Sequence, residues 1–263
     1  MRVVSLTKTL ILASVLLGGV AVQAQDPFEI QVYDSLTAEP GSPGLELHVN
    51  SSLRDSQSHA TLEPHFGLTR LNELGGYLQT VLLPDGRYEY AGFKLRLKTA
   101  APRLLNGQLG LAVNLEFSDV PRAFDPAGLG GELRPIVDFR KGRFYAALNP
   151  ILSFELGGPR KFQPQLEPAT KVAWSVSVPV SVGMEYYGAY GPLRAMEFTG
   201  PSAHRLFAAL DYTARWFDVN LGVGDGFSAR DRVLFKAVFG VHPPRAASSS
   251  TTGPRTDKQE PAR

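Results

Sequence analysis

Histidine and glutamate side chains recur on one face of the stretch from Leu45 to Leu68, and their types and spacing suggest chemistry. His48 precedes a polar break at 54–59, His65 follows it, and both alternate with apolar residues. Such a period of two is typical of the strands of a β-hairpin. If the two residue numbers of each facing pair in the hairpin sum to about 113, His48 lies opposite His65, with Glu63 nearby. We predict a pH-sensitive pair or a metal site with Glu63 as third ligand; two hydrogen-bonded structural histidines are the alternative.

A second group of ionisable residues is the ladder of Lys94, Arg96 and Lys98, which also alternates with apolar residues. On a strand that lines a channel, this ladder predicts a stripe that attracts anions. The alternative is a ladder neutralised by glutamates across the interior, because a buried charge is costly unless it is paired.

The polar faces of the predicted strands together indicate an interior that is either wet or densely ion-paired. The candidate lumen-lining residues are Glu46, His48, Asn50, Glu63, His65, Lys94, Arg96, Lys98, Glu116, Arg134, Asp138, Glu167, Lys171 and Glu185. Within this set the only metal-ligating candidate is the weak combination of His48, His65 and Glu63.

The sequence contains no GxSxG, HExxH or phosphate-binding motif, so we expect no catalytic residue, no cofactor and no enzyme activity. Ser202, His204 and Asp211 offer the least weak combination for a lipid hydrolase, although His204 is better explained as a loop or interface residue. The formal net charge of +2 implies no nucleic-acid partner, and the absence of cysteine excludes disulfides and thiolate metal sites.

The elements that position these side chains are strands, since no helical period competes in any long window. The alternation predicts about twelve of them, at 44–53, 60–69, 73–83, 87–98, 108–118, 131–140, 143–155, 162–174, 178–188, 204–213, 216–224 and 232–241.

Several features favour an all-β, transmembrane antiparallel up-and-down β-barrel over a soluble sandwich. Most predicted strands approach the length of about 9–11 residues that a membrane crossing needs. Longer loops alternate with shorter turns, and the even strand number returns both ends to one side. Aromatic residues such as Trp174, Trp216 and Tyr88 fall near strand ends, as in interfacial girdles. Prolines inside predicted strands, Pro135 and Pro150 among them, must then lie at bulges or rims.

The chain divides into four segments. Residues 1–24 have the charged start, apolar core and small residues of a signal peptide for export. Residues 25–43 are expected to form an N-terminal periplasmic segment, and 44–241 the outer-membrane barrel. Residues 242–263 are polar and rich in serine, threonine and proline, which predicts a disordered tail.

Two short segments carry a resemblance to known proteins: DPFEIQVYD at Asp26–Asp34 and LELH at Leu45–His48. They resemble an uncharacterised group of bacterial outer-membrane β-barrel proteins, broadly similar to the transporters of the MetA-pathway type associated with phenol degradation. The resemblance spans roughly Asp26 to Val241. It implies an outer-membrane barrel and transport, but it supplies no catalytic or binding residue.

The leading functional interpretation is therefore a narrow channel or transporter for small solutes in the bacterial outer membrane. A closed structural or interaction barrel and an outer-membrane lipid hydrolase are the alternatives. The expected partners are outer-membrane lipid and a small-molecule solute. Neither the solute nor the oligomeric state can be derived from the residues.

Overall fold

The computed structural model describes residues 26–52, 57–124, 128–157, 161–196, 204–226 and 233–243. Among these, no helix is long and apolar enough to cross a membrane. The strands are β1 (Pro43–Ser52), β2 (Ser58–Gly67), β3 (Asn72–Leu82), β4 (Tyr88–Ala100), β5 (Leu109–Asp119), β6 (Leu129–Lys141), β7 (Phe144–Asn149), β8 (Leu152–Glu155), β9 (Gln165–Leu166), β10 (Ala169–Ser175), β11 (Val180–Gly188), β12 (His204–Thr213), β13 (Phe217–Gly226) and β14 (Leu234–Val241).

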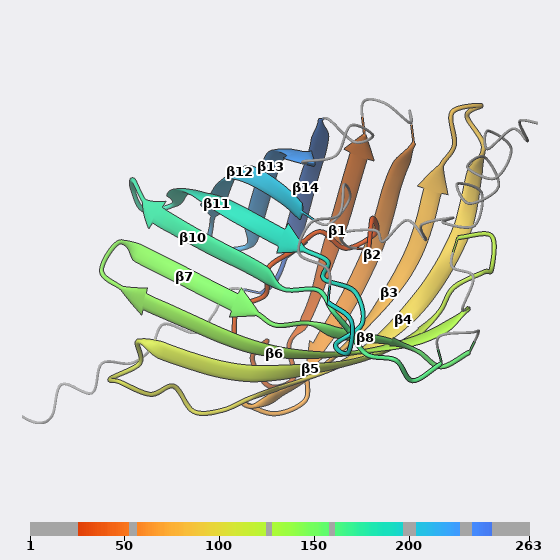
Figure 1. The fold of residues 1–263 in the computed structure, drawn as a ribbon. Coiled ribbons are helices and arrows are strands. Elements are labelled where there is room, and N and C mark those ends of the chain that lie inside the picture. Colours follow the sequence, from red (N-terminus) through yellow and green to blue (C-terminus); the bar gives the residue numbers. More distant parts are fainter. Residues whose placement is uncertain are drawn as a thin grey trace, which may run out of the picture.

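The strands form one closed antiparallel sheet (Figure 1), which confirms the predicted barrel of about twelve strands. From β1 to β6 and from β10 to β14 each strand pairs with the next in sequence, and β14 returns to pair with β1. β7 and β8 form one interrupted strand, because both pair with β6, and β9 and β10 form another. We name the end where β1 begins and β14 ends the inner end, and the opposite end the outer end.

The prolines lie where the sheet is interrupted, as predicted. Pro150 separates β7 from β8, and Pro168 separates β9 from β10. Pro135 lies in β6 opposite the same gap, between the residues that pair with β7 and those that pair with β8. Its missing N–H therefore removes no ladder hydrogen bond on that side.

The outward face of the barrel is apolar and the inward face is polar, the reverse of a water-soluble protein. Leu78, Leu95 and Met184 are exposed outward by 48%, 55% and 55%, whereas Gln79, Arg96 and Glu185, which follow them in the chain, point inward and are buried. Exposed aromatics lie near both rims, with Trp216 at the inner end and Tyr88 at the outer end. This is the arrangement of a barrel whose outer face is in contact with lipid.

The first hairpin has a different register from the one predicted. Its paired residue numbers place His48 opposite Thr61, Glu46 opposite Glu63 and Gly44 opposite His65. β2 begins at Ser58, before the predicted start at residue 60, so the turn comes earlier than the break at 54–59 suggested. The register moves by an even number of residues, and every side chain therefore keeps its predicted face.

Residues 26–42 are here called the N-terminal segment, and 26–38 of it run inside the barrel (Figure 1, red), while 39–41 are exposed at the inner end. This placement corrects the expectation of a periplasmic segment at 25–43. Phe28 packs near the outer end against Val81 and Ala91. Further along, Tyr33 packs against the wall beside Ile136. At the inner end the segment turns, and Gly41 donates to the carbonyl of Gly67 before β1 begins. The segment therefore runs through the interior from the outer to the inner end.

Candidate functional site in the barrel interior

The structure places the predicted lumen-lining residues on the inward face of the wall. Most are buried, namely His48, Asn50, Glu63, Lys94, Arg96, Lys98, Glu116, Arg134, Asp138, Lys171 and Glu185. Glu46, His65 and Glu167 are partly exposed. Because so many charges lie in a confined space, their pairing determines what the interior can do.

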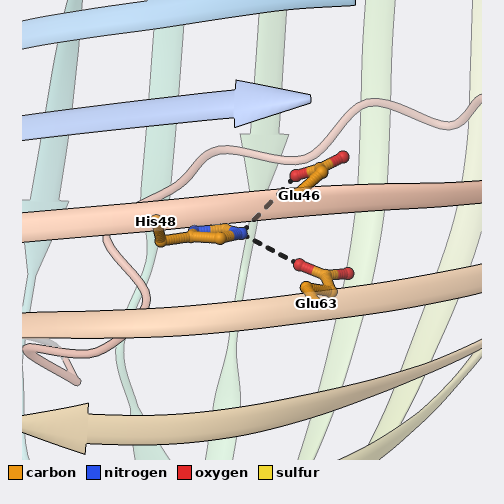
Figure 2. Close-up of side chains that lie close together, drawn as sticks. All are labelled: Glu46, His48 and Glu63. Carbon is orange, nitrogen blue, oxygen red and sulfur yellow. Dashed lines mark hydrogen bonds and ion pairs between the residues drawn. The ribbon is translucent and has the colours of Figure 1, made fainter. Parts of the chain in front are cut away.

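One cluster joins Glu46 and His48 of β1 to Glu63 of β2 (Figure 2). His48 Nε2 lies 3.0 Å from Glu63 Oε2 and 3.5 Å from Glu46 Oε2. The three side chains can each offer one ligand atom, and these atoms lie within 4.8 Å of one another. Imidazole and carboxylate are ligands that zinc accepts, so this cluster could hold a divalent cation.

His65 does not belong to this cluster, so the predicted pair of histidines is not formed. Its ring lies over Gly44, where an added Cβ would come within 2.0 Å of His65 Nε2. The predicted set of His48, His65 and Glu63 is thus replaced by Glu46, His48 and Glu63.

The carboxylates of the cluster already have donors besides His48. Arg96 Nη2 lies 2.9 Å from Glu63 Oε1, and Tyr33 donates to Glu63 Oε2 at 3.3 Å. Gln31 donates to Glu46 Oε2 at 3.3 Å. A cation bound here would replace part of this network, and the same contacts explain the cluster as a structural ion pair without metal.

The basic ladder of β4 is neutralised from two sources. Arg96 pairs with Glu73 of the neighbouring strand β3 and with Glu63 of β2, one strand further along the wall. Lys94 and Lys98 instead pair with the N-terminal segment. Lys94 Nζ lies 2.6 Å from Asp26 and 3.0 Å from Glu29, and Lys98 Nζ lies 3.8 Å from Asp34.

β6 contributes further cations to the same contact. Arg134 Nη2 lies 2.9 Å from Glu29 Oε1, and its guanidinium stacks over Tyr33 at 4.6 Å. Arg140 pairs with Asp34 at 2.5 Å. Glu29 is buried, so its charge depends on these partners.

Side chains of the wall also satisfy the backbone of the N-terminal segment. Asn149 accepts from Tyr33 N at 2.7 Å and donates to Tyr33 O at 3.0 Å. Thr61 donates to the carbonyl of Phe28, and Asp138 accepts from the N–H of Ser35 at 2.9 Å. The segment is thus held as an extended chain by side chains, without a strand ladder to any neighbour.

Sequence reasoning missed the acidic and aromatic residues of this segment. Asp26, Glu29 and Asp34 were expected outside the barrel, because a short run without a partner strand carries no period that shows where it lies. The available signal was a segment, 26–42, with four acidic residues and no lysine or arginine, preceding a strand set with a basic ladder.

A second ion-pair group lies on the opposite wall. Glu185 of β11 pairs with Lys171 at 3.1 Å and with Lys236 of β14. Lys171 also pairs with Asp211 at 2.6 Å, and Lys236 donates to the carbonyl of Ile30 at 3.2 Å. This group therefore also supports the N-terminal segment.

A cavity of about 610 Å³ opens at the inner end. It is lined by charges of both signs, among them Lys98, Arg140, Lys171, Glu73 and Asp211. Its size suits a small solute, whereas the N-terminal segment fills the interior beyond it.

The structure does not bring together the residues considered for a hydrolase. His204 and Asp211 are seven positions apart on β12 and hence on opposite faces, roughly 23 Å apart at about 3.3 Å per residue. His204 contacts Tyr186 through a hydrogen bond of 2.6 Å, and Asp211 is paired with Lys171. Ser202 lies outside the described residues.

No family model matches the chain, and neither does any curated protein. Among solved structures, the fold is similar to that of the KdgM porin, with a TM-score of 0.53 and 8% identity, covering 75% of this chain and 98% of that one. It is also similar to the NanC porin in a rhombohedral crystal form, with a TM-score of 0.51 and 8% identity, covering 77% of this chain and all of that one. The chain has a porin-like barrel fold.

Proposed function

We propose that this protein is an outer-membrane channel for small solutes, closed in the present conformation by its own N-terminal segment. The observation that carries the proposal is the occupancy of the interior. A closed barrel with an apolar exterior surrounds a charged space, and a stretch of chain that belongs to no strand of the wall fills much of it.

The attachment of the segment supports an opening step. Apolar side chains of the segment, such as Phe28 and Tyr33, pack against the wall without forming a backbone ladder. Over residues 26–38 its polar contacts with the wall are ion pairs and hydrogen bonds that involve side chains. Such contacts can exchange for water or for a solute without breaking the barrel. The cavity at the inner end offers a place where a solute could first meet these charges.

The location and the signal peptide at 1–24 belong to the same proposal. The apolar exterior supports insertion in the outer membrane. The resemblance of Asp26–Asp34 and Leu45–His48 to transporters of the MetA-pathway type also supports transport, but it names no solute.

A closed structural barrel is the second candidate, and one specific observation favours it. Wall side chains such as Asn149, Thr61 and Asp138 bind the segment's backbone at several points along its length. A segment bound this well would also suit a permanent core that never leaves.

Conductance of refolded protein in a planar bilayer distinguishes the two candidates. A channel gives discrete openings in the full mature chain, and their frequency rises when residues 26–38 are deleted. A permanently closed barrel is silent in both forms, although heat-modifiable mobility on a gel shows that both have folded. Silence of both folded forms would reject the channel.

A further inference from the structure

The N-terminal segment carries only acidic charges, and they meet the wall selectively. Its carboxylates are Asp26, Glu29, Asp34 and Glu39, with no basic residue between 26 and 42. The first three make ion pairs inside the barrel, whereas Glu39 is exposed at the inner end. The three paired carboxylates are spaced along an extended chain.

The cations that receive them lie on β4 and β6, the strands on either side of β5, and we call this set the cationic track. It consists of Lys94, Lys98, Arg134 and Arg140. Lys94 lies nearest the outer end and binds Asp26 and Glu29, Arg134 binds Glu29, and the two cations nearer the inner end bind Asp34. The segment's negative charges thus follow the track along the barrel.

Removing the segment would affect the two sides of the interior differently. On β1 to β3, Glu63 keeps His48 and Arg96 as partners, because these come from the wall itself. On the cationic track, Lys98 would lose its pairing with Asp34, and Lys94 would keep Glu116, at 3.8 Å, as its one ion-pair partner among the described residues. Arg134 and Arg140 would each lose a carboxylate of the segment and keep one of the wall, Glu132 and Asp138 respectively. The path along β4 and β6 would therefore become more positive.

The wall is also shaped to receive an extended chain. A Cβ at Gly110 would lie 2.0 Å from Ser35 Oγ, and one at Gly67 would lie 2.2 Å from the carbonyl oxygen of Glu39. Both glycines leave the room that the segment's backbone and small side chains occupy. Because the interior already holds an extended peptide, a linear molecule of similar width fits the same path.

We infer that the N-terminal segment occupies the binding track of an extended solute bearing several carboxylates, and that such a solute competes with the segment for Lys94, Lys98, Arg134 and Arg140. The inference rests on the proposed channel function and specifies its solute class. The segment acts as an internal copy of the ligand's charge pattern, and binding of the solute exchanges one set of carboxylates for another.

The test uses the mature chain, a variant lacking 26–38, and the charge variant Asp26→Asn/Glu29→Gln/Asp34→Asn. Glu39→Gln is the matched control, since it neutralises an exposed carboxylate of the same segment. Reversal potentials in a potassium chloride gradient give ion preference. Hexaglutamate, hexaglutamine and hexalysine are added as probes of the open current.

We expect both altered forms to open more often than the mature chain and to prefer chloride over potassium several-fold, while Glu39→Gln behaves as the mature chain. Hexaglutamate should reduce the open current at a concentration at least ten-fold lower than hexalysine or hexaglutamine. Lys98→Gln and Arg134→Gln together, in the deletion background, should remove that difference.

Open channels that prefer potassium, or that all three peptides block equally, would overturn the inference and leave the channel intact. Folded forms that never conduct would instead overturn the proposed channel function. If the deletion variant does not fold, the charge variant gives the same readings, because it keeps the whole chain.

Discussion

Replacing Glu29 with glutamine measures how strongly ion pairing holds the N-terminal segment in the barrel. The carboxylate is 1% exposed and lies 3.0 Å from Lys94 and 2.9 Å from Arg134. Glutamine has nearly the same shape, so the change removes charge and little else. Removing one partner of a buried pair costs about 3–5 kcal/mol, because the remaining charge is left uncompensated.

The lower end of that range applies, because each cation keeps another carboxylate. Lys94 retains Asp26 at 2.6 Å, and Arg134 retains Glu132 at 2.5 Å. A loss of about 3 kcal/mol in docking free energy raises the undocked fraction of the segment roughly 100-fold, since about 1.4 kcal/mol is a factor of ten.

Thiol labelling measures this fraction directly, because the chain has no native cysteine. Ser35→Cys introduces a thiol at a buried position of the segment. Its labelling rate should rise roughly 100-fold when Glu29→Gln is added and opening is fast relative to labelling. Glu39→Gln in the same background should leave the rate unchanged.

Two results would refute this reasoning. An unchanged labelling rate would mean that the ion pairs of Glu29 do not govern docking. A rise accompanied by loss of heat-modifiable mobility would mean that the segment is part of the barrel's stability and does not move independently.

Three further predictions follow from other parts of the structure. Leu221→Arg places a charge on the lipid face in the middle of β13 and should destabilise the folded barrel by about 2–4 kcal/mol in urea titrations in lipid vesicles, whereas Leu221→Met should cost far less; equal tolerance of both would contradict the assigned face. Zinc should raise the unfolding temperature of the protein, and this effect should be absent in His48→Ala and present in His65→Ala. If the effect persists in both variants, the cluster of Glu46, His48 and Glu63 binds no zinc. Gly110→Ala should release the N-terminal segment and raise open-channel frequency, while Gly76→Ala, whose Cβ would make an ordinary contact of 3.5 Å, should not; identical recordings from the two would remove the steric argument.

The barrel could be predicted from the sequence because its outer face is in contact with lipid and its inner face borders a charged interior. Alternation across each strand follows directly from lipid outside and charge inside, so outward Leu95 and inward Arg96 were assigned correctly. The interruptions at Pro150 and Pro168 also follow from local chemistry, since proline cannot donate to a ladder.

The register of the first hairpin and the interior segment could not be predicted in the same way. Shifting a register by an even number leaves the alternation unchanged, so the pattern could not separate His48 opposite His65 from His48 opposite Thr61. The path of residues 26–42 depends on contacts with β4, β6 and β7, which are distant in sequence. Asp26 and Glu29 show their partners only when the barrel is closed around them.

The direction in which the N-terminal segment runs has a consequence for assembly. Asp26 lies towards the outer end, while β1 begins at the inner end, so the chain ahead of β1 must pass lengthwise through the barrel. Either the segment is in place before β14 closes against β1, or its free end is threaded in afterwards from the inner side. A folded domain fused ahead of Asp26 could not be threaded through a closed barrel. Such a fusion would keep the segment out if threading comes last, and would leave it docked if the barrel closes around it, so the fusion distinguishes the two orders of assembly.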